Sequence, residues 1–331
     1  MKIKDIAEMA NTSVSTVSRV INGDQNVKQP TREKVLAVIK KTGYKPNVMG
    51  RNLRRQSSNN ILAILPTMAN PIYSAIIRGV EQRANAHHFD VVIVISHRNS
   101  ALEKKYLEML YTKEVDGVIT FVSFLDDDVL EKTASQYPLV LCSGTAKCEH
   151  LSYTCIDNER AAYDATSYLI ELGHQKIARI SGSFSKRYET ERDRGYERAM
   201  KKHGMNVCDE YIINDGQNYR DGYVFAKELM ALDNPPTAIF ASSDTIASGC
   251  IKYLGDAGIK AGVDVDVMGF DNLPLGEILT PTLSTVAQPL ETLGSTAFDL
   301  LYEKMQNINS ARKRVILDHK LVVRDSTRNH K

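Results

Sequence analysis

The sequence predicts two dissimilar parts: a small all-α head, followed by a larger α/β body built as two doubly wound parallel-sheet lobes. Three observations carry this prediction. Apolar residues recur at helical spacing in short segments of residues 1–60, and short apolar runs alternate with amphipathic segments after residue 60. The charge also divides there, since residues 1–60 hold 12 Lys and Arg against four Asp and Glu, whereas the remainder holds 30 against 36. A basic head on an acidic body suggests a polyanionic partner for the head, although a solvated basic face is the alternative.

The first two helices of the head are predicted from a small residue, a turn residue and two apolar residues at fixed spacing. Ala7 is small enough to let two helices approach, and Asn11 tolerates the left-handed turn conformation. Ser13 is a suitable N-cap, and Val17 and Val20 then face the first helix. This spacing indicates a helix-turn-helix, with an ordinary helical hairpin as the alternative.

A third helix is predicted from about Pro30 to Thr42, ending at Gly43. Proline is favoured in the first turn of a helix and glycine just after its end. The helix is expected to turn one apolar side toward the other two helices, and that side carries Val35, Leu36, Val38 and Ile39. The three short helices would share one small core.

The exposed side of the second helix carries groups that can read DNA. These are Val14, Ser15, Thr16 and Arg19, with Ser18 and Asn22 alongside. In a major groove, arginine can bond bidentately to guanine and valine can touch the methyl group of thymine. The hydroxyl groups can meet bases or phosphates.

The body reads as strand, helix, strand throughout, which is typical of parallel sheets with helices on both faces. The first series of strands comprises ILAIL (61–65), VVIVI (91–95), GVITFV (117–122), PLVLC and YTCID. A second series follows a helix from about Asn158 to Leu172 and comprises KIARISG, TAIFASSD and VDVMGFD. The last segments are STVAQ, a helix at about Leu290 to Met305, RVIL and KLVVR.

Five polar or aromatic residues are candidates for a ligand site, because each follows a predicted strand or lies near the start of a helix. They are Asn70, Tyr73, Arg192, Asp244 and Asp271. Carboxylates and a guanidinium offer the paired hydrogen bonds that sugar hydroxyls need, and an aromatic face packs on a pyranose. Taken singly, Asp244 could cap its helix, Arg192 could form a surface ion pair and Tyr73 could belong to the core.

Other function classes lack their motifs. There is no GxGxxG after the first strand, no GxxxxGK[ST] and no GxSxG, so no cofactor or catalytic constellation is expected. His87 and His88 read as a solvated turn, and the five cysteines form no CxxC pair, so no metal site is expected. No apolar run is long enough to span a membrane, and the charged N-terminus does not read as a secretory signal. A cytoplasmic location is therefore expected.

Several stretches together resemble the lactose/galactose repressor family of bacterial transcription regulators. They are IKDIAEMANTSVSTVSRVING, TREKVLAVIKKTGYKPN, RNL, RDRGYERAM, VMGFDN and LVVRDST. The resemblance implies that Val14, Ser15 and Arg19 read bases, and that Lys2, Ser13, Thr16, Asn22 and Tyr44 mostly contact the DNA backbone. It also implies a periplasmic-binding-protein-like core, in which the last segments, from STVAQ to KLVVR, cross back between the lobes. In that core, Arg192 matches the effector-binding arginine of the motif RxxG. The pair VS at positions 14 and 15 is similar to that of the catabolite-control branch.

The resemblance further implies a hinge helix whose leucine enters the minor groove at the centre of a palindromic site, and Leu53 matches that leucine. The chain departs from the family at Gly50, where alanine is usual, and at Lys2, where Thr or Ser often caps the first helix. A helix-interior glycine costs roughly 0.5 to 1 kcal/mol, so the hinge is expected to order only when two copies meet on the duplex. Phosphate contacts would then offset the ordering cost, from Arg51, Arg54 and Arg55, with a solvated charge run in the linker as the alternative.

These inferences combine into one predicted organisation. Residues 1–45 form the DNA-binding domain, residues 46–60 the hinge helix and linker, and residues 61–331 the effector-binding and dimerisation core. Within the core, one lobe is expected at about 61–157 and 289–316, and the other at about 158–288 and 317–331. The expected function is a homodimeric repressor of a pseudopalindromic double-stranded DNA operator, controlled by a sugar-like effector that is either inducer or corepressor. A transport module without a DNA role and an enzyme on the same scaffold are the alternatives.

Overall fold

The computed structural model describes residues 1–44, 57–182 and 186–327, with the backbone alone at residues 186–189. The chain divides into two compact units, Met1–Ser58 and Asn59–Lys331, each of which is described by itself. The predicted hinge residues lie outside the described residues. These are Gly50, Arg51, Leu53, Arg54 and Arg55.

The first unit contains the three predicted helices, α1 (Ile3–Met9), α2 (Val14–Ile21) and α3 (Gln29–Thr42). Their shared core consists of Ile6, Ala7, Ala10, Val17, Val20 and Val35. Asn11, between α1 and α2, has φ +50°, and Gly43 ends α3 with φ +61°. The turn and the stop therefore use the two residue types that tolerate a left-handed backbone, as the sequence predicts.

The helix ends of this unit are capped by local hydrogen bonds. Ser13 Oγ accepts the Thr16 N–H of α2 at 3.2 Å. Lys2 provides no side-chain cap for α1, but its own N–H donates to Asp5 Oδ2 at 2.7 Å. Leu36 was predicted on the buried side of α3, and that prediction is wrong because 48% of Leu36 is exposed. Successive helical residues turn by about 100°, so a stripe that includes Val35 leaves Leu36 outside it.

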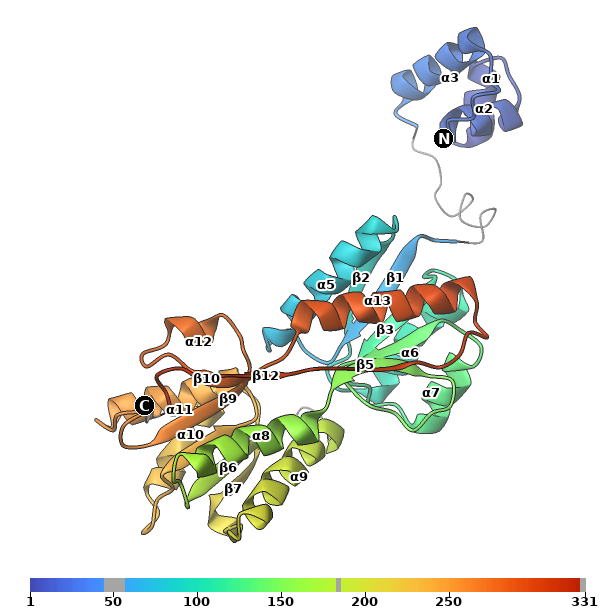
Figure 1. The fold of residues 1–331 in the computed structure, drawn as a ribbon. Coiled ribbons are helices and arrows are strands. Elements are labelled where there is room, and N and C mark those ends of the chain that lie inside the picture. The colour runs from blue at the N-terminus through green and yellow to red at the C-terminus, as the bar shows by residue number, and fades with distance from the viewer. Residues whose placement is uncertain (45–56, 183–185, 328–331) are drawn as a thin grey trace. The chain divides into compact units, whose positions relative to one another are not determined.

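The first sheet of the second unit has the order β11-β5-β4-β3-β1-β2, and all its strands are parallel. The strands are β1 (Asn60–Leu65), β2 (Asp90–Ile95), β3 (Gly117–Phe121), β4 (Leu139–Cys142), β5 (Ser152–Ile156) and β11 (Arg314–Leu317). The accompanying helices are α5 (Ile72–Ala86), α6 (Ser100–Tyr111), α7 (Asp127–Ala134) and α13 (Leu290–Gln306). Figure 1 shows α13 running beside α5 on this lobe.

The second sheet has the order β12-β10-β9-β8-β6-β7. Its strands are β6 (Ile177–Gly182), β7 (Ile212–Gly216), β8 (Ala238–Ala241), β9 (Asp266–Asp271), β10 (Ser284–Ala287) and β12 (Lys320–Val322). Its helices are α8 (Asn158–Glu171), α9 (Lys186–Lys202), α10 (Tyr219–Met230), α11 (Asp244–Asp256) and α12 (Leu275–Ile278), with the short 3-10 helix η1 (Asp209–Tyr211). Strand β12 pairs antiparallel with β10. Parallel strands were predicted from the sequence, and this pairing was not anticipated.

Each sheet carries one apolar core on either face, which confirms the doubly wound architecture. In β1, Ile61 and Ala63 belong to the core shared with α5 and α13, whereas Leu62 and Ile64 belong to the core shared with α6 and α7. In the second sheet, one core includes residues of α10 and α11 and the other includes residues of α8 and α9. Strand residues that alternate between two buried faces explain why the strands read as continuous apolar runs.

Helices α5 and α13 approach closely because each places a glycine at the contact. A Cβ added at Gly79 would lie 1.9 Å from the backbone oxygen of Glu291, and one added at Gly294 would lie 1.9 Å from that of Ile76. Neither position can hold a side chain without moving a helix. The pair of glycines therefore fixes α13, which comes late in the chain, on the first lobe.

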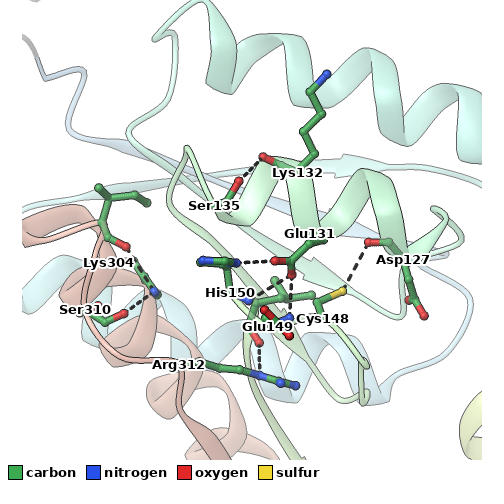
Figure 2. A network of polar contacts seen from close by, with 12 residues as sticks. Asp127, Glu131, Lys132, Ser135, Cys148, Glu149, His150, Lys304, Ser310 and Arg312 are labelled. Carbon is green, nitrogen blue, oxygen red and sulfur yellow. Dashed lines mark hydrogen bonds and ion pairs between the residues drawn. The ribbon is translucent and has the colours of Figure 1, made fainter.

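A polar network holds the chain where it returns from α13 to the edge strand β11 (Figure 2). Arg312 donates from Nε to Leu151 O at 3.0 Å and from Nη2 to Ala146 O at 2.8 Å. Lys304 Nζ donates to Ser310 O at 2.7 Å. The segment that leads into β11 is thus tied to the loop between β4 and β5. The last two strands belong to different sheets, β11 to the first and β12 to the second, as predicted.

Candidate ligand cleft and DNA-reading surface

The carboxyl ends of the parallel strands border a cleft with about 520 Å³ of empty space, which includes open solvent. Both lobes contribute to its walls, with Asn70, Ile72, Tyr73, Val122, Ser143, Cys155 and Ile156 from the first and Asn158, Arg192, Ser242, Ser243, Asp271 and Gln288 from the second. Four of the five predicted ligand residues are among them. The mixture of apolar and polar walls is typical of small-molecule sites.

Arg192 is the buried cation of the cleft. Its Nε donates to Asn158 Oδ1 at 2.9 Å and its Nη1 donates to Ser242 O at 2.7 Å. Its guanidinium carbon lies 3.6 Å from the centre of the Phe270 ring. Helix α9 begins at Lys186, so the prediction that Arg192 lies at the helix start is wrong by about two turns.

Gly195 lets α9 pack close enough to α8 for Arg192, three residues earlier, to reach the cleft. A Cβ at Gly195 would lie 2.2 Å from the backbone oxygen of Glu159 and 2.8 Å from the Cβ of Ala162. Only a residue without a side chain lets α9 approach α8 so closely. The approach brings Arg192 of α9 to Asn158, the first residue of α8.

Asp271 ends β9 with φ +116°, a value that residues other than glycine rarely adopt. Its Oδ1 accepts a hydrogen bond from Gln288 Nε2 at 2.7 Å. The next residue, Asn272, also has a positive φ of +58°. Backbone strain of this kind persists where the surroundings fix it and often marks a binding site.

Asn70 and Tyr73 contribute differently from one another. Asn70 Oδ1 accepts the N–H of Ile72, the first residue of α5, at 3.0 Å. The Tyr73 ring is almost fully buried and meets Phe121 edge to face, with ring centres 6.1 Å apart. Burial and the nearby Asp271 raise the pKa of Tyr73. Tyr73 thus borders the cleft while most of its ring belongs to the core of the first lobe.

Asp244 is placed outside the described lining of the cleft, behind its wall. It is fully buried, and it accepts hydrogen bonds from Leu273 N–H at 2.6 Å and from Thr285 Oγ1 at 2.5 Å. Burial raises the pKa of Asp244 to about 7, and these two hydrogen bonds lessen the rise. Helix α11 is capped by Ser243, one residue earlier, and it is Ser243 that borders the cleft.

Several other residues of the cleft wall were not predicted, although they occupy the same kind of place as the predicted ones. Each follows the carboxyl end of a strand or opens the next helix: Val122 after β3, Ser143 after β4, Asn158 after β5, Ser242 after β8 and Gln288 after β10. Ligand sites in such sheets lie at the carboxyl ends of the strands, so the residue after each predicted strand is a candidate. Nothing in the residue types of Val122 and Ser143 signals their positive φ values of +50° and +59°.

On the head, α2 turns its polar side outward. Ser15, Arg19 and Asn22 are exposed, whereas Val14 and Thr16 are half-buried and Val14 packs partly on the head core. Ser13 Oγ lies 2.8 Å from both Ser15 Oγ and Thr16 Oγ1.

The other residues predicted to contact DNA differ in their exposure to solvent. Lys2 is exposed just before α1, and Tyr44 is half-buried against the head core. Leu53 lies outside the described residues. Arg19 keeps 63% of its side chain exposed, with Nε 4.0 Å from Asp24 Oδ2, so its guanidinium can still swing to another partner.

A helix-turn-helix unit joined to a two-lobed, cleft-bearing core defines a ligand-responsive DNA-binding protein. The family models agree with that class. The model for bacterial regulatory proteins of the lacI family matches residues 2–47, and the model for periplasmic binding proteins and the sugar binding domain of the LacI family matches residues 58–324. The chain belongs to the LacI family of DNA-binding transcriptional regulators, which confirms both the resemblance and the fold class that the sequence predicts.

The chain is similar over nearly its whole length to proteins of this family. It is 34% identical to catabolite control protein A of Priestia megaterium over 329 residues, covering 98% of this chain and 99% of that protein. It is 35% identical to the transcriptional repressor CytR of Escherichia coli K12 over 327 residues, covering 98% and 96%. Among solved structures, the complex of the transcriptional regulator CelR with cellobiose matches with a TM-score of 0.74, 28% identity and coverage of 98% and 99%. No helix among the described residues has both the length and the apolar character needed to cross a membrane.

Proposed function

We propose that this chain is a homodimeric repressor that binds a pseudopalindromic operator and is controlled by a sugar or sugar derivative held between its lobes. The observation that carries the proposal is the composition of the cleft wall. Asn70 and Ser143 reach it from the first lobe, and Asn158, Arg192 and Asp271 reach it from the second. A ligand with hydroxyl groups on several sides would bond to both lobes at once and hold them closed.

The division of labour follows the sequence prediction. Residues 1–45 would bind DNA, residues 46–60 would form the hinge and residues 61–331 would bind ligand and dimerise, with lobe boundaries near 157, 289 and 316. Val14, Ser15 and Arg19 would read bases, and the backbone contacts would come from Lys2, Ser13, Thr16, Asn22 and Tyr44. Leu53 would enter the minor groove. The exposure of Ser15 and Arg19 on α2 supports this arrangement.

One α2 helix per copy offers only a few base contacts, so specificity requires two heads at a fixed spacing. A ligand that closes the lobes would change the spacing of the two hinges and so favour or oppose their joint insertion. Because the two sites are coupled, operator DNA must alter the affinity for the ligand by the same factor as the ligand alters the affinity for DNA.

The ligand class is tested by thermal shift of the full chain with D-glucose, D-galactose, D-ribose, cellobiose and glucose 6-phosphate. A bound ligand raises the melting temperature, because it binds the folded state and not the unfolded one. We expect at least one of these compounds to raise it, and the same compound to change operator affinity. A flat response to all five would reject the sugar class.

The competing function is an enzyme acting on a sugar at the same cleft. The relatives named above are transcription regulators, which favours regulation. The two functions are separated by incubating the full chain with the compound that raises its melting temperature and then analysing that compound. A regulator returns it unchanged, whereas an enzyme converts it.

A further inference from the structure

In each lobe, one wall residue with a positive φ is held from behind in the same way. Val122 follows β3 with φ +50°, and Asp271 ends β9 with φ +116°. Both border the cleft. A β-branched residue such as Val122 is a genuine outlier in this region of backbone space, so something must hold it there.

In the first lobe, the support comes from Glu103, in the first turn of α6. The Phe124 N–H, two residues after Val122, donates to both carboxylate oxygens of Glu103, at 3.2 and 3.1 Å. The hydroxyl of the intervening Ser123 donates to Glu103 Oε2 at 2.7 Å. Glu103 is 1% exposed.

In the second lobe, the support comes from Asp244, the first residue of α11. The Leu273 N–H, two residues after Asp271, donates to Asp244 Oδ2, and the hydroxyl of Thr285 donates to Oδ1. The geometry repeats that of the first lobe: a left-handed wall residue, a backbone N–H two positions on, and a buried carboxylate from the first turn of a neighbouring helix. Both carboxylates sit behind the wall, outside its described lining.

Burying a carboxylate is costly, and neither group gains the compensation that a partly exposed acid would gain from water. Burial raises the pKa of Glu103, and the hydrogen bonds from Ser123 and Phe124 oppose that rise. A buried carboxylate accepts several strong hydrogen bonds from a fixed backbone, which an apolar residue cannot do. A buried carboxylate lies behind a strained wall residue in both lobes. This repetition indicates that the carboxylates fix the backbone conformation of the wall.

We propose that Glu103 and Asp244 are matched positioning residues, one in each lobe, that hold Val122 and Asp271 in the conformation that a ligand meets. Removing one of them frees the wall of its own lobe and leaves the other wall unchanged. That either residue affects ligand affinity rests on the proposed function, whereas its hold on the wall does not. The two parts of the proposal can therefore be tested separately.

The test is amide hydrogen exchange on the full chain without ligand, in Glu103→Ala and Asp244→Ala. We expect Glu103→Ala to raise exchange at least tenfold at residues 123–125, and Asp244→Ala to do so at Asn272 and Leu273. Each variant should leave the other segment and the strands of both sheets as in the wild type. The matched controls are Glu108→Ala on α6 and Asp256→Ala on α11, both exposed, and they should change neither segment.

Conservative variants provide the rescue. In Glu103→Gln and Asp244→Asn the amide oxygen can still accept the backbone N–H while the neighbouring hydroxyl turns to accept from the amide nitrogen. We expect wild-type exchange in both. Unchanged exchange in the alanine variants, or a uniform rise across the lobe, would overturn the proposal.

If an alanine variant does not fold, amide exchange in the wild type still tests whether the two carboxylates hold the wall. The Phe124 and Leu273 amides must then exchange far more slowly than unprotected loop amides, and unprotected rates would refute the support. Affinity for the same five compounds, D-glucose, D-galactose, D-ribose, cellobiose and glucose 6-phosphate, is measured in parallel by calorimetry. If none of them binds the wild type, the proposed ligand class is lost while the exchange result still judges the two carboxylates. If one binds, the alanine variants should weaken it at least tenfold and the conservative variants should restore it.

Discussion

The guanidinium of Arg192 lies 3.6 Å from the centre of the Phe270 ring while its Nε is bonded to Asn158 Oδ1 at 2.9 Å. The aromatic ring supports one face of the guanidinium and the amide fixes its edge. A lysine could not reproduce this arrangement, because its ammonium group is not planar and does not stack in the same way. The position of the cation in the cleft is thus set before any ligand arrives.

The first prediction concerns Arg192→Ala and Arg192→Lys. We expect both variants to bind operator DNA as the wild type does and to lose the change in affinity that the ligand produces. The measurement is fluorescence anisotropy with operator DNA, with and without the sugar that raises the melting temperature. Arg160→Ala is the control, since Arg160 is exposed and pairs with Asp164 on α8. A normal ligand response in Arg192→Lys would contradict the placement.

The second prediction concerns Arg19→Ala. We expect a loss of about 1 to 3 kcal/mol on cognate DNA and a much smaller loss on random DNA, because a base contact is specific whereas a phosphate contact is not. Competition binding at fixed salt measures both. Lys34→Ala removes the same charge from an exposed position on α3 and should weaken both DNAs alike. Equal losses for Arg19→Ala on the two DNAs would reject base reading.

The third prediction concerns Gly195→Ala. The added methyl group would lie 2.2 Å from the backbone oxygen of Glu159, so α9 must move away from α8 and Arg192 must move with it. We expect weaker ligand binding and a loss of stability of about 1 to 3 kcal/mol. Gly255→Ala is the matched control on α11, because no atom lies within 4 Å of its added Cβ. Calorimetry and denaturant unfolding would contradict the account if the two variants behaved alike.

The fourth prediction concerns pH. Burial raises the pKa of Asp244 from 3.8 to about 7 in the folded chain. The stability that this group contributes is therefore present below pH 4 and is lost as the pH rises through about 7. Asp244→Asn removes that loss, so its stability relative to the wild type should increase between pH 4 and pH 8, by up to roughly 4 kcal/mol.

Denaturant unfolding at several pH values measures this difference. Asp233→Asn, at an exposed position, is the control and should follow the wild type closely. A difference between Asp244→Asn and the wild type that stays constant with pH would contradict the raised pKa.

The sequence predicts the parts of this fold that depend on a particular residue at a turn or helix end, and those that depend on the pattern of apolar residues. Asn11 and Gly43 adopt the left-handed backbone expected of them, and Ser13 caps α2. The alternation of apolar runs with amphipathic segments predicts two sheets with helices on both faces, because that pattern has few other compact solutions. The antiparallel pairing of β12 was missed, since three residues at a sheet edge carry no signal of direction.

Four of the five predicted ligand residues border the cleft, the fifth lies one residue from its wall, and several other wall residues were not predicted. Asp244 and Ser243 are adjacent after β8, and only the geometry of the helix start decides which of them borders the cleft. The positive φ of Val122 depends on contacts with Glu103 from a distant helix, which no local pattern contains. Tertiary contacts decide such positions, and a single sequence does not reveal them.

In the proposed function, two copies of this chain read one DNA site as a pair. Binding sites for the full chain are therefore selected from a library of random duplexes. We expect an enriched inverted repeat of two half-sites at one fixed spacing, with Arg19→Ala relaxing the same base pair in both halves. Enrichment of a single half-site, or of no sequence at all, would contradict it.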